Sequence, residues 1–103
     1  MQLSENQPFT KRVLVIGRQE LQLTSILNAL YESGFDSIGV IQNDEALRFF
    51  DEHDPHIVII INNIDDESSR FLKQHFLNIK PTTTILELSG GVSALKLLLS
   101  HID

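Results

Sequence analysis

The chain has 103 residues, of which 42% are hydrophobic and 21% are charged, as expected for one soluble globular domain. It contains no Cys, which excludes disulfide bonds, thiolate metal sites and cysteine nucleophiles. Its formal net charge of −6 argues against nucleic acid or anionic lipid as the main partner, and no apolar run approaches the roughly 18 residues of a membrane span. We therefore expect a cytoplasmic protein with no nucleic-acid or membrane partner.

The first part of the chain predicts an arm, a strand and a helix. Residues 1–10 (MQLSENQPFT) lack periodicity, so we expect a flexible N-terminal arm there and a single domain over 11–103. Residues 13–16 (VLVI) form a short apolar run that ends at Gly17, which is typical of a buried strand. From Glu20 the spacing becomes helical, and Gly34 is placed to end the helix. The apolar face of this helix is Leu23, Ile26, Leu27 and Leu30.

Residues 35–42 predict a second strand, whose weak apolar character indicates a position at the edge of a sheet. Asn43 or Asp44 can cap the helix that follows. One face of that helix contains Ala46, Leu47, Phe50 and His53.

The most apolar stretch is residues 57–61 (IVIII), which are all β-branched. Pro55 precedes this stretch, and Asn62 and Asn63 suit the turn that ends it. A strand that is apolar on both sides belongs in the middle of a sheet with helices on both faces. These residues therefore predict the central strand.

The last part of the chain predicts a helix, a fourth strand and a final helix. Residues 65–67 place negative charge where the dipole of the first of these helices favours it, and its apolar stripe is Phe71, Leu72, Phe76 and Ile79. Residues 82–89 predict the fourth strand. The final helix has an apolar face of Val92, Leu95, Leu98, Leu99 and Ile102. This alternation predicts an α/β fold with an open parallel four-stranded sheet of order 2-1-3-4, helices on both faces, flavodoxin-like but lacking the fifth strand.

Three features of the sequence occur in the same order, and with the same spacing, as in a known protein family. They are Gly34, residues 43–47 (NDEAL) and residues 55–60 (PHIVII). From Arg12 to about Ser89 the chain resembles the receiver domain of two-component response regulators. The family's fifth strand, with its lysine, and its final helix are absent from these 103 residues. The resemblance implies a receiver-like domain that is truncated at its C-terminal side.

The resemblance also implies a reaction centre, and the residues at its positions differ here. The family has an acidic pair that holds magnesium after the first strand, where this chain has Gly17 and Arg18. The phosphoacceptor aspartate corresponds to Ile61, and a shift by one residue brings in only Asn62. Ser89 matches the hydroxyl residue that closes the fourth strand. Aspartyl phosphorylation needs a carboxylate nucleophile and a cation. We therefore expect a phosphorylation-incompetent domain that is not an enzyme and uses no metal or cofactor.

Polar residues are predicted at the carboxyl ends of the strands, where ligands bind in open α/β sheets. The candidate pocket at this rim consists of Arg18, Asn62, Asn63 and Ser89, with Arg18 as an anion-binding group. Loops between strands and helices need such residues in any case, and the acidic residues 65–67 oppose a phosphate ligand. We favour the structural explanation and keep a small-ligand-binding domain as the alternative function.

Two other signals are weak. Residues 13–17 (VLVIG) lack the second and third glycines of a dinucleotide-binding loop. His53 and His56 have Pro55 between them, which interrupts the helical spacing of a metal pair.

The function we expect is protein interaction, with another protein or with a second copy of the chain. In the predicted strand order the fourth strand lies at an edge, where its backbone groups are free to pair. On the last helix, Leu97, Ala94 and His101 lie on the side opposite Leu95. We therefore expect a homodimer through the fourth strand and the last helix. The alternative is that the last helix folds over this edge and leaves a monomer.

Overall fold

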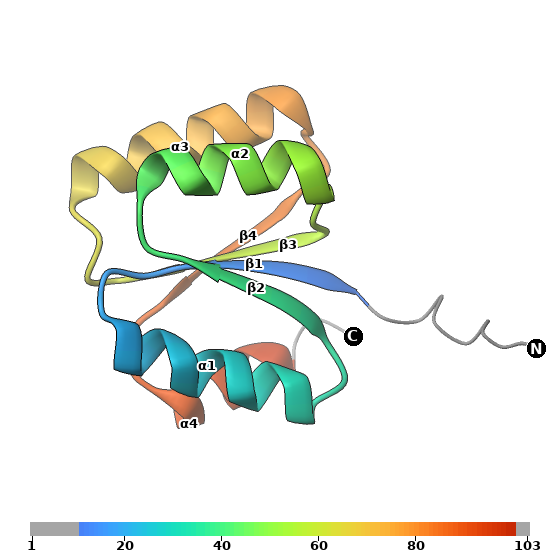
Figure 1. Cartoon of the computed structure of the whole chain (residues 1–103), viewed down its shortest axis with the longest axis vertical. Coiled ribbons are helices and arrows are strands. Elements are labelled where there is room, and N and C mark those ends of the chain that lie inside the picture. Colours follow the sequence, from blue (N-terminus) through green and yellow to red (C-terminus); the bar gives the residue numbers. More distant parts are fainter. Residues whose placement is uncertain (1–10, 101–103) are drawn as a thin grey trace, which may run out of the picture.

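The structure is a computed structural model that describes residues 11–100. Strands and helices alternate along this part of the chain, as the sequence predicts, and they are coloured in order in Figure 1. Their bounds are β1 (Arg12–Ile16), α1 (Glu20–Glu32), β2 (Asp36–Val40), α2 (Asn43–His53), β3 (Ile57–Ile61), α3 (Asp66–Ile79), β4 (Thr84–Leu88) and α4 (Val92–Leu99). The predicted arm, together with His101 and Ile102, lies outside the described residues.

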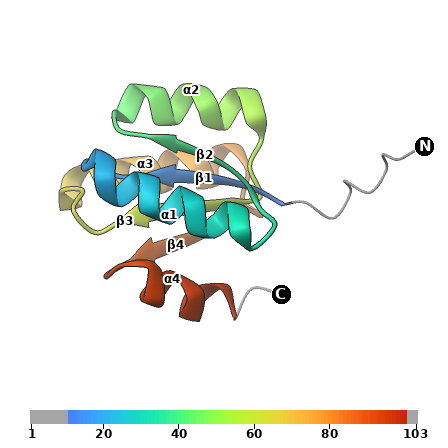
Figure 2. The same cartoon turned by 60° about the horizontal axis from the view of Figure 1, so that its bottom comes forward.

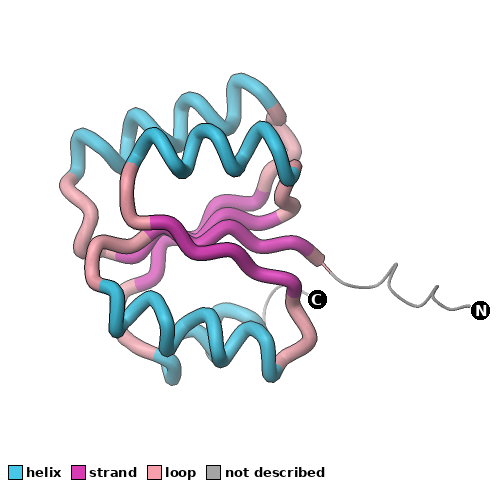
Figure 3. Tube along the Cα trace, viewed as in Figure 1, coloured by secondary structure: helices cyan, strands magenta, loops and turns pink. Residues whose placement is uncertain are grey.

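The four strands form one parallel sheet with the order β2-β1-β3-β4. In the register of the sheet, Val15 of β1 lies between Gly39 of β2 and Ile59 of β3. Helices α2 and α3 cover one face of the sheet, and α1 and α4 cover the other (Figures 1 and 3). This flavodoxin-like arrangement confirms the predicted strand order, including the edge position of β2.

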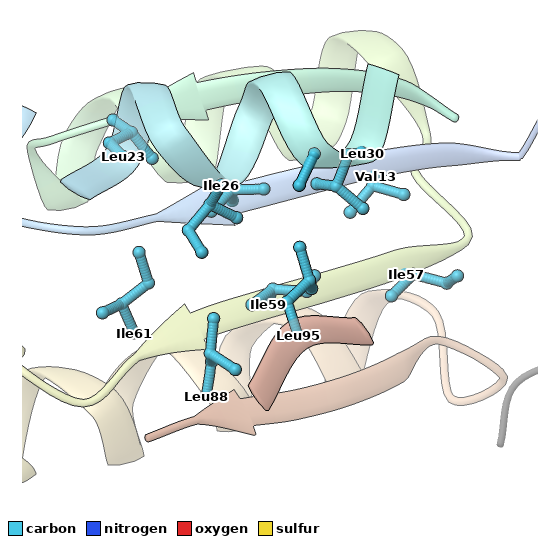
Figure 4. Close-up of a cluster of buried hydrophobic side chains, with 11 residues drawn as sticks. Val13, Leu23, Ile26, Leu30, Ile57, Ile59, Ile61, Leu88 and Leu95 are labelled. Carbon is cyan, nitrogen blue, oxygen red and sulfur yellow. The ribbon is translucent and has the colours of Figure 1, made fainter. Parts of the chain in front are cut away.

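The central strand is β3, and all five of its residues are buried. Because side chains alternate along a strand, Ile57, Ile59 and Ile61 pack in the core under α1 and α4, as Figure 4 shows. Val58 and Ile60 pack in the second core, under α2 and α3. The two-sided apolar character of this stretch therefore reflects its position between two helical layers.

Helix α4 lies on the same face of the sheet as α1 and packs against it near β4 (Figure 2). Connections between parallel strands are right-handed, and α3 makes such a connection from β3 to β4 over the opposite face. A right-handed connection to a parallel strand outside β4 would cross the same face as α3. In this position, α4 covers the core with Leu95. The helix does not follow the path that a connection to a further parallel strand at that edge would take.

The helix ends agree with the sequence at two places and differ at one. Gly34 follows α1 with a φ of 91°, where glycine is favoured, and Asp65 caps α3. The N-cap of α2 is Gln42, whose backbone N–H donates a hydrogen bond to Oε1 of Glu45 over 3.3 Å. The prediction of Asn43 or Asp44 as this cap was wrong, because Asn43 is the first helical residue and uses its side chain elsewhere.

Two of the four residues predicted for the buried apolar stripe of α3 are buried in the structure. Leu72 and Phe76 are fully buried, whereas Phe71 and Ile79 are 50% and 51% exposed. Successive helical residues turn by about 100°, so Phe71 lies to the side of the row formed by Leu72 and Phe76, and Ile79 is the last helical residue. Within residues 11–100, none of the helices is long and apolar enough to cross a membrane.

Candidate functional site

The carboxyl ends of β1 and β3 meet at the position where the receiver resemblance places a reaction centre. Gly17 follows β1 and Ile61 ends β3, and both residues are buried. A Cβ atom on Gly17 would lie 2.7 Å from Cδ1 of Ile61. The Ile61 side chain therefore occupies the space beside Gly17, and these two positions make an apolar contact.

Arg18, the next residue, binds to the neighbouring loop after β2. Its guanidinium group donates hydrogen bonds to the backbone carbonyl of Ile41 and, over 2.6 Å, to Oδ1 of Asn43. Both acceptors are partly buried, and guanidinium bonds of this kind are directional. The cation is therefore used to hold the start of α2 against the end of β1.

Asn63 connects the loop after β3 to the same group of residues. Its Oδ1 accepts a hydrogen bond from the backbone N–H of Arg18 over 3.3 Å, and its Nδ2 donates to Oε1 of Gln22 over 2.9 Å. Asn43 extends the network, because its Nδ2 donates to Oγ of Ser68 on α3 over 3.0 Å. Three strand-to-helix loops are thus joined by side-chain hydrogen bonds.

Asn62 and Ser89 form a separate pair at the ends of β3 and β4, with 3.2 Å between Nδ2 of Asn62 and Oγ of Ser89. The structure thus brings the four predicted rim residues together as two hydrogen-bonded pairs, Arg18 with Asn63 and Asn62 with Ser89. Gln22, Asn43 and Ser68 belong to the first network and were not predicted. No local spacing in the sequence signals them, because they contact residues 25 to 41 positions away.

The residues at this site do not fit the magnesium ion that the receiver fold implies. Gly17 offers no side-chain oxygen, and Arg18 places a cation where the fold family has an acid. Among residues 11–100, there is also no group of three or more His, Asp or Glu side chains that could hold a metal ion. Oxygen ligands with negative charge are what Mg²⁺ requires, so this arrangement is unsuited to it.

A fixed negative charge lies beside the rim at the start of α3. The carboxylate of Asp65 accepts a hydrogen bond from the backbone N–H of Ser68 over 3.0 Å. This bond, with a smaller contribution from the charge of Arg18, lowers the pKa of Asp65 below its usual 3.8. The carboxylate is therefore ionised at neutral pH, and it disfavours a phosphate ligand at this end of the sheet.

A second surface of interest is formed by β4 and α4. Leu97 is 67% exposed on the outer side of α4, and Ala94 is half-buried beside it. These two residues line a hollow of about 210 Å³ together with Leu98 and the end of β4, Glu87, Leu88 and Ser89. The predicted third member of this surface, His101, lies outside the described residues.

A larger hollow, of about 240 Å³, lies at the opposite end of the sheet. It is lined by Lys11, His56, Ile57, Lys80, Thr82 and Thr84. The ammonium group of Lys80 is already bonded to Asp54 over 2.8 Å and to the carbonyl of Pro55 over 2.9 Å. The bond and charge of Lys80 lower the pKa of Asp54, so this cation is neutralised within the protein.

No family model matches the chain, and no curated protein matches it by sequence. Solved structures do match. A response regulator from Thermotoga maritima is 24% identical, with a TM-score of 0.71 over 89% of this chain and 76% of the other. A response regulator from Desulfuromonas acetoxidans is 25% identical, with a TM-score of 0.61 over 87% and 76%.

A third similar structure is the pseudo-receiver domain of the CikA protein. It is 22% identical, with a TM-score of 0.65 over 79% of this chain and 71% of the other. The TM-scores, all above 0.6, show that the three structures share the overall fold of this chain. This chain therefore has the receiver-domain fold.

Proposed function

We propose that this chain is a receiver-fold domain that takes no phosphoryl group and acts by binding protein. The chemical half of the proposal is supported by the contact between Gly17 and Ile61. Aspartyl phosphorylation needs a carboxylate that attacks phosphorus and a cation that neutralises the transferred group. An isoleucine side chain buried against a glycine supplies neither of these.

The Arg18 network supports the same conclusion. Its hydrogen bonds to Asn43 and Asn63 join the loops of the rim from within the protein. The polar atoms of the predicted rim pocket are thus used in internal hydrogen bonds, which favours the structural explanation for them over ligand binding. We also propose no enzymatic activity, since the hydroxyl of Ser89 is paired with an amide rather than with a base.

The binding half of the proposal rests on the outer side of β4 and α4. Leu97 exposes two thirds of its surface there, next to an apolar hollow, at the edge of the sheet. Exposed apolar groups beside a free strand edge are typical of surfaces that another chain covers. One of the similar structures is described as a pseudo-receiver, which agrees with a receiver fold that works without the usual reaction.

The chemical half is tested by incubating the purified chain with acetyl phosphate and Mg²⁺, followed by intact-mass measurement. A receiver domain that has both the acidic pair and the phosphoacceptor serves as the positive control. We expect the control to gain a phosphoryl group that hydroxylamine removes, while this chain keeps its mass. A stoichiometric, hydroxylamine-labile adduct on this chain would refute the proposal.

A further inference from the structure

The outer edge of β4 has backbone groups that face away from the sheet. On its inner side, the N–H of Thr84 donates to the carbonyl of His56 over 3.1 Å, and the carbonyl of Leu88 accepts from the N–H of Asn62 over 2.9 Å. Backbone groups of successive residues in a strand point to opposite sides. The even-numbered residues of β4 therefore bond to β3, and the odd-numbered residues face outward.

The outward residues are Ile85 and Glu87, each with one N–H and one C=O. Among residues 11–100, no strand pairs with this edge. Helix α4 lies on the α1 face and does not follow the right-handed path to a further parallel strand. Within residues 11–100, the outer edge of β4 is thus open. The single charged side chain of β4 is Glu87.

We infer that β4 pairs with β4 of a second copy of this chain, antiparallel and around a two-fold axis that passes beside Leu86. This inference rests on the proposed binding function and names its partner. A strand edge is complementary to itself under a two-fold rotation, because each N–H of one copy meets a C=O of the other. The result is one continuous sheet that extends through both copies.

The charge of Glu87 selects the register of this pairing. Outward residues must oppose outward residues, which leaves three antiparallel registers within β4. In the first register Ile85 lies opposite Ile85 of the second copy, and in the second register Glu87 lies opposite Glu87. Each of these registers gives one hydrogen-bonded pair, and the second also places two carboxylates face to face. Ile85 opposite Glu87 of the partner gives two such pairs and keeps the carboxylates apart. It places the two copies of Leu86 opposite each other at the axis.

The side chains near the outer edge of β4 are compatible with pairing to a second copy of the chain. Glu87 forms an ion pair with Lys73 of α3, so the nearest acidic charge is already compensated within each copy. Leu97 and the hollow beside it lie along the outer side of β4 on the other face. The two-fold axis brings the α4 helices of both copies to the same face of the extended sheet, where Leu97 becomes covered.

The inference is tested first by the oligomeric state, with sedimentation equilibrium across a concentration series. We expect a monomer–dimer equilibrium in the parent chain. Glu87→Pro removes an outward N–H from each copy and leaves the bonds to β3 intact, so it should weaken the dimer by at least about 30-fold. Glu87→Ala is the matched control, because it removes the same carboxylate but keeps the N–H, and it should still dimerise. A parent chain that is monomeric at all concentrations overturns the inference.

The register is tested by single cysteines, since the chain has none of its own. Residues that oppose each other in a non-hydrogen-bonded antiparallel pair have Cα atoms about 4.5 Å apart, within disulfide range. Leu86→Cys should therefore form a covalent dimer under mild oxidation. Thr84→Cys should not, because in this register the two copies of position 84 are separated by four residues along the paired strands.

Equal cross-linking of both variants, or of neither, contradicts the register. These outcomes are independent of the phosphodonor experiment. If the chain is a monomer and gains no phosphoryl group, the inferred dimer is wrong. The proposal that the chain takes no phosphoryl group then still stands.

Discussion

Cδ1 of Ile61 lies 2.7 Å from the place that a Cβ atom on Gly17 would occupy. Real Cβ atoms do not come this close to a neighbour, so a side chain at Gly17 would require the terminal Cδ1 of Ile61 to move. The two positions are also those at which the receiver resemblance expects an acid and a phosphoacceptor. An apolar contact therefore stands where the resemblance expects acidic residues.

This packing predicts an energetic coupling between the two residues. Gly17→Ala should lower the free energy of unfolding by about 1–3 kcal/mol, because the new methyl group overlaps Ile61. Ile61→Val removes the overlapping Cδ1 and should cost about 0.5–1.5 kcal/mol alone. The double variant should be less destabilised than the sum of the single variants, as urea titration will measure. Strictly additive losses would show that the contact is absent.

The sequence predicted those parts of the fold that depend on local patterns. The apolar runs of β1 and β3 indicated buried strands because a strand covered on both faces has no polar side. Patterns along one helix were less informative, since Phe71 has the same character as Phe76 but lies to the side of the buried row. Apolarity shows that a residue can be buried, while its position around the helix depends on how the helix is placed.

The candidate site was predicted in part for a related reason. Asn62, Asn63 and Ser89 were identified because polar residues at the ends of parallel strands converge. Their hydrogen-bond partners could not be found in this way. Gln22 and Ser68 lie within helices, and the two networks depend on contacts between residues distant in the sequence.

The pKa of Asp65 predicts a dependence of stability on pH. Its hydrogen bond to the backbone of Ser68 lowers the pKa in the folded state below 3.8. A lowered carboxyl pKa contributes stability above the pKa of the unfolded state, and this contribution is lost as pH falls through the folded-state pKa.

Asp65→Asn keeps an oxygen that can accept the bond but does not titrate there. The difference in melting temperature between parent and variant should therefore be constant near neutral pH and shrink below about pH 4. A difference that stays unchanged down to the acid transition would contradict this role of the carboxylate.

The surface of α4 predicts that a charge will have different effects at two exposed leucines. Leu97→Lys places an ammonium group in the proposed dimer interface and should weaken association without lowering the melting temperature of the monomer at low protein concentration. Leu21→Lys is the matched control, since Leu21 is an exposed leucine of α1 and receives the same change of charge. Sedimentation equilibrium compares the two variants, and equal effects on association would place the interface elsewhere.

The most direct test of the central claim is whether association needs a phosphoryl group. The parent chain is examined by sedimentation equilibrium across a concentration series, with and without acetyl phosphate and Mg²⁺. We expect the same monomer–dimer equilibrium in both conditions, because we propose that the chain takes no phosphoryl group and because no strand of residues 11–100 pairs with the outer edge of β4. A dimer that forms only in the presence of the phosphodonor would contradict the account.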